Sequence, residues 1–288
     1  MLRLRKDIPL FPGGRKKAFT LSTDDGVTQD GRLVSLMKKY GIKGTFNLNS
    51  GTMGHKDRLV QSGIDVSHYK YPREDIARIY DGFEIAVHTV SHPDLARIPS
   101  SVVSYEISAD KKALEDIVRH PVRGMAYPFG TYNDNIAQIA ANCGIIYSRT
   151  VKDTLGFKLP QNFLFWHPTC HYCNKQRTAL GEQFLAPVSD AEYKEPLLFY
   201  VWGHAYELDA YEGWDSIEDF FKLISRRDDI WYASNLEICS YLKATEHLIY
   251  SSSGEYITNP TCQDVWMQID HKPYRIPAGA TITVYWEN

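Results

Sequence analysis

Short apolar runs alternate with amphipathic stretches along most of this chain, and that alternation restricts its fold more than any other feature. Runs typical of buried strands occur at residues 18–22, 44–48, 83–87, 123–127, 145–148 and 197–202. Stretches with apolar residues at helical spacing occur at residues 30–40, 100–119, 134–142, 217–225 and 236–244. Strands that alternate with helices predict a parallel sheet covered on both faces. So many such units within 288 residues favour an α/β barrel over an open sheet.

Two regions depart from this alternation. The tail from Thr245 is rich in Ser, Thr and Pro, and its apolar runs at 264–270 and 281–286 predict a small antiparallel β appendage. We therefore expect a barrel over residues 1–244 and an appendage over 245–288. Residues 51–71 are polar and glycine-rich, which predicts a long surface loop, and long loops in compact domains are often functional.

Composition excludes several classes of protein. Lys and Arg number 32 against 35 Asp and Glu, a net charge of −3 that argues against nucleic-acid binding. No apolar run approaches the roughly 20 residues of a membrane-spanning helix. The N-terminal segment has charges but no apolar leader region, which predicts a cytoplasmic protein or a chain whose leader has been removed. Five cysteines at irregular spacing form no disulfide framework and favour a reducing compartment.

Reactive side chains follow the predicted strands, where the functional groups of barrels and α/β sheets gather. Asp24 and Asp25 end the first strand and are followed by Gly26. Adjacent carboxylates repel each other unless a positive group lies beside them, so a divalent metal could take one and leave the other as a proton acceptor. The alternative is an Asp-rich turn with Gly26 at positive φ.

His88 and His92 follow the run at residues 83–87. Histidines at i and i+4 share one face of a helical turn and can hold one ion. With Asp25 they would form a two-histidine, one-carboxylate set with open positions, which is typical of a catalytic metal. The alternative is a pair of surface histidines.

Two further strand ends carry candidate groups. Tyr127-Pro128-Phe129-Gly130 is a turn that can point a backbone N–H outward, as an oxyanion hole requires, although it also fits an ordinary proline turn. His204 follows the apolar run that ends at Trp202 and is a candidate general acid, or else a structural histidine.

Taken together and in this order, the four motifs resemble those of the polysaccharide deacetylases of the NodB-homology type, carbohydrate esterase family 4. The resemblance covers residues 17–244. It implies a distorted (β/α) barrel of about seven strands, in agreement with the alternation above.

The resemblance also implies roles for individual residues. Asp24 matches the catalytic base and His204 the general acid, and the backbone N–H of Phe129 would stabilise the oxyanion. The metal would be zinc, or else cobalt or another divalent ion, and its ligands would be Asp25, His88 and His92. The implied reaction is attack of an activated water on an N-acetyl group, which yields acetate and a free amino sugar.

The sequence departs from the family pattern at Ala126, where an arginine commonly orients the base. Arg123 lies three residues earlier and faces the opposite side of the strand. We expect Arg149, at the end of the next strand, to replace the missing arginine, and the alternative is a surface pair between Arg149 and Asp153. The acidic residue that braces His204 is left open among Asp153, Glu207 and Asp209.

Aromatic residues near these strand ends predict a sugar-binding cleft. His167, Cys170, His171 and Cys173 form half of a four-ligand zinc pattern, but with no second half we favour an active-site loop. Residues 206–214 are interpreted as a solvated loop. The expected stacking residues are Trp166 and Tyr172 on the active-site loop, together with Tyr127, Trp202 and Tyr206, although Trp202 also fits a core position.

The leading prediction is a metal-dependent N-deacetylase whose partner is an acetylated amino sugar or glycan. A second is an amidohydrolase of a small linear or cyclic amide such as allantoin, which would need a closed pocket. A homo-oligomer would supply such a pocket at a subunit interface. A third is a sugar-binding relative with weakened catalysis, which the missing arginine favours.

Overall fold

The computed structural model describes residues 7–61, 63–188 and 195–284. Residues 1–6, part of the N-terminal segment predicted to lack a leader, lie outside these ranges. So do residues 285 and 286, the end of the apolar run at 281–286. In the described part of the chain, no helix is both long enough and apolar enough to cross a membrane.

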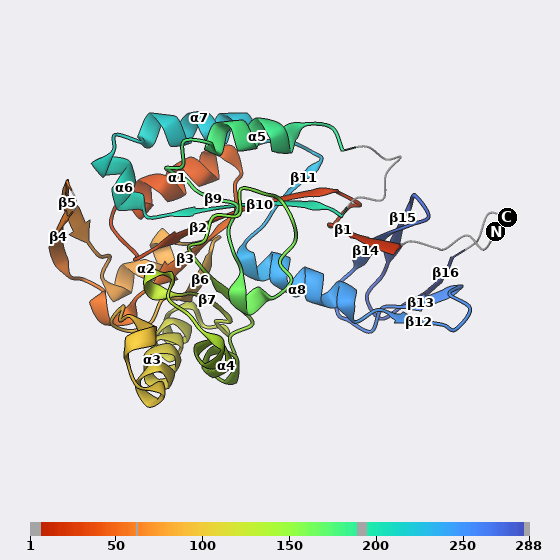
Figure 1. The fold of residues 1–288 in the computed structure, drawn as a ribbon, viewed down its shortest axis with the longest axis horizontal. Helices are drawn as coiled ribbons and strands as arrows, with labels where there is room; N and C mark the ends of the chain where they lie inside the picture. The colour runs from red at the N-terminus through yellow and green to blue at the C-terminus, as the bar shows by residue number, and fades with distance from the viewer. Residues whose placement is uncertain (1–6, 62, 189–194, 285–288) are drawn as a thin grey trace.

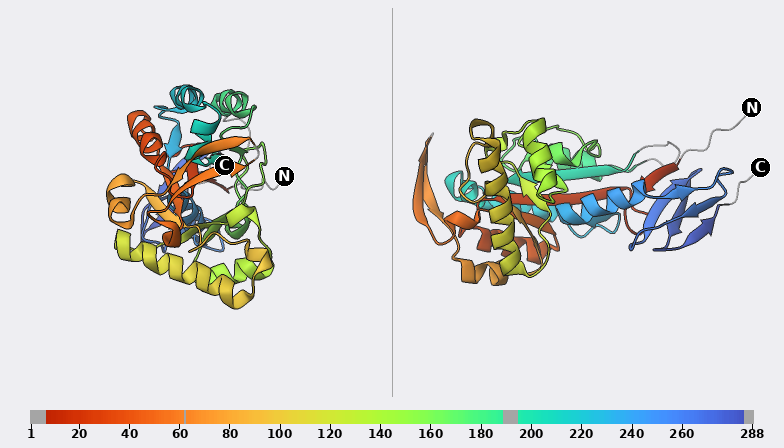
Figure 2. Two further views of the ribbon diagram at one scale, coloured as in Figure 1. Left: turned by 90° about the vertical axis from the view of Figure 1, so that its left-hand side faces the viewer. Right: turned by 90° about the horizontal axis from the view of Figure 1, so that it is seen from below.

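A parallel sheet forms the centre of the fold (Figure 1). Its strand order is β8-β7-β6-β3-β2-β10-β9, and β11 pairs with the first residues of β2. The sheet curls into a half-barrel (Figure 2), which confirms the predicted distorted barrel. Its strands are β2 (Lys17–Asp24), β3 (Gly44–Leu48), β6 (Glu84–Val87), β7 (Gly124–Ala126), β8 (Tyr147–Arg149), β9 (Cys170–His171), β10 (Leu197–Gly203) and β11 (Ile230–Tyr232).

Helices cover both sides of this sheet, with α1, α5 and α7 along one side and α3 and α4 along the other (Figure 1). The α-helices are α1 (Asp30–Tyr40), α2 (Arg73–Ile79), α3 (Ser100–Val118), α4 (Asp134–Asn142), α5 (Arg177–Leu185), α6 (Ala205–Ala210), α7 (Trp214–Ile224) and α8 (Asn235–Glu246). Short 3₁₀ turns are η1 (Ser50–Thr52), η2 (Leu95–Arg97), η3 (Pro128–Gly130) and η4 (Phe163–Phe165).

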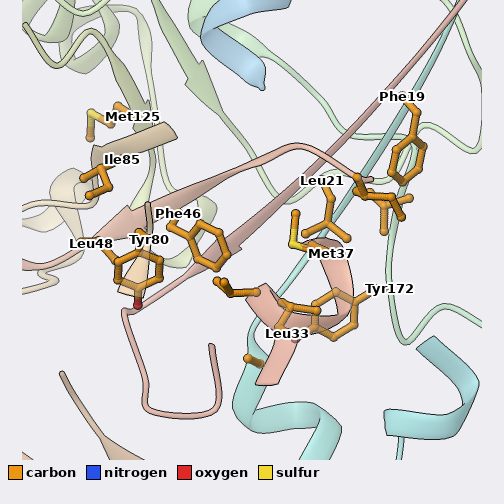
Figure 3. Close-up of a cluster of buried hydrophobic side chains, with 14 of the residues drawn as sticks. Phe19, Leu21, Leu33, Met37, Phe46, Leu48, Tyr80, Ile85, Met125 and Tyr172 are labelled. Atoms are coloured by element: carbon orange, nitrogen blue, oxygen red, sulfur yellow. The ribbon is translucent and has the colours of Figure 1, made fainter. Parts of the chain in front are cut away.

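Strand β2 is buried along its whole length, because it lies between β3 and β10 and has helices on both faces. Its side chains Phe19 and Leu21 join the main apolar cluster, which includes Phe46 of β3 and Met37 of α1 (Figure 3). This packing fixes the carboxyl end of β2, and with it the position of Asp24.

The region predicted as a long surface loop contains instead a β-hairpin of β4 (Lys56–Gln61) and β5 (Ile64–Tyr69). The two strands pair antiparallel, with Lys56 opposite Tyr69. Most of their side chains are exposed, so the segment lacks the apolar alternation by which a strand is recognised. Residues 206–214 are likewise not a solvated loop, because they form most of α6 and the start of α7.

The tail folds into short antiparallel strands with an apolar cluster of their own. Strand β1 (Asp7–Leu10), from the start of the chain, pairs antiparallel with β14 and so adds to the sheet of the tail. The boundary at residue 244 stays a prediction. The tail strands are β12 (Ile249–Tyr250), β13 (Tyr256–Thr258), β14 (Val265–Ile269), β15 (Lys272–Ile276) and β16 (Thr281–Thr283).

Tyr241 of α8 links β1 to the tail. Its buried Oη donates to the carbonyl of Leu10 at 2.5 Å and accepts from the N–H of Trp266 at 2.9 Å. We expect Tyr241→Phe to lower the free energy of unfolding by about 1–3 kcal/mol, because two backbone groups lose their partner. Urea denaturation measures this loss. Tyr105→Phe, at a site 62% exposed, is the control, and an equal effect of both changes would contradict the prediction.

Candidate active site

The carboxyl ends of β2, β6, β8 and β10 bring the predicted catalytic groups together. Asp24 is the last residue of β2, and His204 directly follows β10. One carboxylate oxygen of Asp24, Oδ2, lies 3.7 Å from Nε2 of His88 and 3.8 Å from Nε2 of His204. Four strands far apart in the sequence thus contribute to one site.

Asp24 is buried, and both of its carboxylate oxygens accept hydrogen bonds. Its Oδ1 accepts a hydrogen bond of 2.8 Å from Nδ2 of Asn47, and its Oδ2 accepts one from Nη2 of Arg149. Burial alone would raise the pKa of Asp24, but the attraction of Arg149, His88 and His204 outweighs burial and lowers it. The carboxylate is therefore ionised and can accept a proton. Asn47, on β3, is a residue that the sequence analysis missed.

Arg149 lies beside Asp24, the residue that it was expected to orient. It is fully buried, and its register partner on the neighbouring strand β7 is Ala126. Partner residues of adjacent strands project from the same face of a sheet, so the guanidinium reaches Asp24 from beside Ala126. The alternative pair with Asp153 is not formed, since Asp153 accepts from Nε1 of Trp202 at 3.3 Å and from the N–H of His171 at 3.2 Å.

Asp25, His88 and His92 form a second group beside Asp24. Oδ1 of Asp25 lies 3.9 Å from Nε2 of His88 and 3.8 Å from Nε2 of His92, and the three ligand atoms lie within 4.8 Å of one another. Burial is the largest influence on both histidines, and it lowers the pKa of His88 to about 4 and also lowers that of His92. Two neutral imidazoles and a carboxylate are the donors that a catalytic divalent transition metal takes.

The hydrogen bonding of His88 provides a test of whether a metal fits. Its Nδ1 lies 2.8 Å from the carbonyl oxygen of Ala126, so Nδ1 carries the hydrogen and Nε2 presents a lone pair. This buried Nε2 has no hydrogen-bond partner among the described residues. A backbone carbonyl that fixes the tautomer of a histidine is the arrangement typical of a metal ligand. The residues present therefore fit a divalent ion.

The turn that carries these histidines is not the helical turn predicted from their spacing. Thr89 and His92 have positive φ angles of 70° and 57°. Hydrogen bonds from Nδ2 of Asn49 to the carbonyl of Thr89, at 3.1 Å, and from the N–H of His88 to Asp110, at 3.0 Å, hold the turn. The two imidazole rings still meet edge to face, with centroids 4.7 Å apart.

Phe129 also adopts a positive φ, of 56°, in the turn η3. Its ring is 64% exposed and packs against the ring of His92 at 4.6 Å. This contact places the turn beside the group of Asp25, His88 and His92. The role of the Phe129 N–H in holding an oxyanion stays a proposal.

Among the three acidic candidates, Glu207 is the one that contacts His204. Its Oε2 lies 3.4 Å from Nδ1 of His204 and accepts from the His204 N–H at 3.0 Å. Asp209 bonds Nε1 of Trp214 instead, at 2.7 Å. Burial lowers the pKa of His204, but Glu207, Asp24 and Asp25 outweigh burial and raise it to about 9. His204 is therefore protonated at neutral pH, as a general acid must be.

His171, Cys173 and Glu207 place three ligand atoms within 4.8 Å of one another. The N–H of Cys173 donates to Nδ1 of His171 at 3.1 Å, so the hydrogen of this ring is on Nε2, 3.0 Å from Glu207. Neither ring nitrogen is left for a metal. His171, from the motif that resembled half of a zinc site, thus holds Glu207 and through it His204.

Most of the aromatic residues expected to stack on a sugar are buried. Tyr127 and Trp166 are each 1% exposed and Tyr172 is 0% exposed, so these predictions are wrong: the rings belong to the core. Trp202 is 8% exposed, and its ring lies 4.3 Å from the guanidinium carbon of Arg149, which it supports. Tyr206 is half-buried and flanks the site, with its ring 5.1 Å from that of His204.

The sequence analysis missed two residues from the hairpin. Nε2 of His68 lies 3.2 Å, and Nζ of Lys70 lies 3.8 Å, from Oδ2 of Asp25. Burial raises the pKa of Asp25, but Lys70, the hydrogen bond from His68 and the charges of His204 and His88 outweigh burial and hold it well below its ordinary value. The available signal was their spacing, since residues two apart share one face of a strand.

Residues 12–148 match the family model described as polysaccharide deacetylase. This part of the chain is similar to the polysaccharide deacetylases. The match includes Asp24, Asp25, His88 and His92 and ends one residue before Arg149. Arg149 and His204 therefore lie beyond the matched residues.

Two curated relatives and one solved structure define the likeness further. The chitin deacetylase of Arthroderma benhamiae is 30% identical over 128 residues, 42% of this chain and 30% of the relative. The Bacillus subtilis protein named "Putative polysaccharide deacetylase YxkH" is 25% identical over 130 residues, 45% of this chain and 43% of the relative. The chain thus spans less than half of the length of either relative.

The chain also aligns with the crystal structure of a protein from Mycobacterium smegmatis that is named "putative polysaccharide deacetylase". The TM-score is 0.57 at 16% identity. The alignment covers 83% of this chain and 94% of that one. At this identity it shows a shared fold, and it extends the polysaccharide deacetylase fold well beyond residue 148.

Proposed function

We propose that this chain is a metal-dependent hydrolase that removes N-acetyl groups from an acetylated amino sugar or glycan. The observation that carries the proposal is the separation of two adjacent carboxylates. Asp24 is held by Arg149 and faces His204, whereas Asp25 faces His88 and His92. One carboxylate is thus available as a base and the other as a metal ligand.

A divalent ion, zinc or a similar metal, would be held by Asp25, His88 and His92. When bound there, it would supply Lewis-acid chemistry, because it polarises a carbonyl oxygen and lowers the pKa of a water. Two observations support the fit. Nε2 of His88 has no hydrogen-bond partner among the described residues, and Oδ1 of Asp25 faces both histidines.

Asp24 and His204 begin the reaction in opposite protonation states. The lowered pKa of Asp24 lets it accept a proton from the attacking water, and the raised pKa of His204, about 9, keeps a proton for the leaving nitrogen. The water oxygen bonds to the acetyl carbon, the C–N bond breaks, and the amine leaves with the His204 proton. The N–H of Phe129 would donate to the carbonyl oxygen that becomes negative.

The test is acetate release by the full chain after chelation, with Zn²⁺ or Co²⁺ added back. Substrates are N-acetylated glucosamine oligomers, a peptidoglycan glycan and small amides that include allantoin. We expect metal-dependent acetate release from a glycan, and none from the matched variant His88→Ala. Hydrolysis of allantoin alone would favour the amidohydrolase alternative. Glycan binding without hydrolysis would favour the sugar-binding alternative.

Glu207→Gln should lower kcat by about 10-fold near neutral pH, because His204 loses the charge that keeps it protonated. Glu207 raises the pKa of His204, so its removal lowers that pKa. Activity that needs the protonated imidazole is lost as pH rises through this pKa, so the basic limb of the kcat profile should move to lower pH.

The matched control is Asp209→Asn on the same helix, whose carboxylate bonds Trp214 and not His204. It should leave the profile unchanged. A basic limb that stays in place in Glu207→Gln would show that this carboxylate does not act on His204.

A further inference from the structure

We infer that the hairpin β4–β5 positions the metal-ligand carboxylate: His68 and Lys70 occupy Oδ2 of Asp25, so Oδ1 alone is presented to the metal. This inference rests on the metal site of the proposed function. It assigns a role to a segment that the catalytic steps do not use.

The two oxygens of Asp25 have different neighbours. Oδ2 lies 3.2 Å from Nε2 of His68 and 3.8 Å from Nζ of Lys70. Oδ1 lies 3.9 Å from Nε2 of His88 and 3.8 Å from Nε2 of His92. The carboxylate is therefore oriented with one oxygen toward the hairpin and the other toward the two histidines.

The hairpin is fixed to the barrel where it contacts Asp25. The N–H of Thr28 donates to the carbonyl of Tyr69 at 2.7 Å, and Nε2 of Gln29 donates to the carbonyl of Ser67 at 2.8 Å. Both donors lie in the turn between Asp25 and α1. The position of His68 against Asp25 is thus set by hydrogen bonds to the carbonyl groups of Ser67 and Tyr69, the residues on either side of it.

Side-chain packing limits the motion of the two hairpin residues. The ring of His68 meets that of Tyr206, from α6, edge to face at 5.0 Å. Lys70 is 8% exposed, and its Nζ lies 3.4 Å from Nε2 of His68. The imidazole and the ammonium therefore hold Oδ2 from two directions.

Holding one oxygen has a chemical consequence for the other. A carboxylate whose second oxygen accepts hydrogen bonds is oriented before the metal arrives and binds through a single oxygen. Lys70 also supplies a positive charge next to Asp25, as Arg149 does next to Asp24, so two adjacent carboxylates can both stay ionised.

The experiment measures metal affinity of the full chain, by competition with a chromophoric chelator for Zn²⁺ and Co²⁺. We expect His68→Ala to weaken both by about 10- to 100-fold, the loss typical when a partner of a ligand is removed. His68→Gln should recover most of the affinity, because its amide N–H can donate to Oδ2. The control is His55→Ala, at an exposed position next to the start of β4.

Two results from the His68 variants would overturn the inference. Unchanged affinity in His68→Ala would show that the hairpin does not position Asp25. An equal loss in His68→Ala and His68→Gln, with metal-free thermal unfolding unchanged, would make His68 a ligand in its own right. If the variants show the expected dependence of metal affinity on His68 but the wild-type chain releases no acetate, the proposed function fails while this inference stands. A wild-type chain that binds neither ion contradicts both.

Discussion

Asp24→Asn is expected to lower kcat by about 10²- to 10⁴-fold, the usual contribution of a general base, while metal content stays near that of the wild-type chain. Asparagine has nearly the shape of aspartate, so the site keeps its geometry. The amide cannot take a proton from water, however, and Asp24 is not one of the three residues that face the metal position.

Kinetics of acetate release together with metal analysis of the same sample test this expectation. Asp25→Asn is the matched comparison, because it changes the adjacent carboxylate and should lower metal content as well as activity. Arg149 is left buried without its counter-charge in Asp24→Asn, so the assay temperature has to lie below the unfolding transition of the variant. Full activity in Asp24→Asn would mean that another group is the base.

Arg149→Met is expected to lower the free energy of unfolding by about 3–5 kcal/mol, because it removes one partner of a buried ion pair. Arg149 is 0% exposed and Asp24 is 2% exposed, so water cannot replace the lost guanidinium without structural change. The kcat should fall as well, since the base loses the group that orients it and keeps it ionised.

Two comparisons separate these effects. Arg149→Lys keeps the charge but lacks the planar guanidinium that packs on Trp202, so an intermediate loss is expected. Arg123→Met removes an exposed arginine of the same part of the chain, and should cost less than about 0.5 kcal/mol. If Arg149→Met and Arg123→Met were equally stable in urea titrations, the buried pair would contribute nothing.

Local patterns predicted the parts of the site that stand at the ends of buried strands. The predicted helix at residues 30–40 and strand at 44–48 coincide with α1 and β3, because burial on a defined face leaves a clear apolar period. Asp24 ends such a strand, Asp25, His88 and His204 directly follow such strands, and parallel strands carry their carboxyl ends to one rim.

The remaining errors have physical causes. A tyrosine or tryptophan next to a reactive strand end serves equally well in a core or in a cleft, and tertiary packing decides between them, as it did for Trp166 and Tyr172. His68 belongs to β5, whose side chains are half-buried or exposed without an apolar period to recognise, and Lys70 directly follows that strand. Choosing Glu207 over Asp209 depends on the helix α6, whose sequence resembles a polar loop.

The central position of β2 has a consequence for synthesis on the ribosome. Its neighbour β3 begins at Gly44, but β10 begins only at Leu197 and β11 only at Ile230. At about 5–20 residues per second, translation takes roughly 9–35 s to reach β10 after Asp24 has been added. During that interval one edge of a strand that is fully buried in the native fold stays unpaired, and an unpaired strand edge can pair with other chains. His204, the proposed general acid, is thus the last of the proposed reactive groups to be translated, long after the residues that would bind the metal.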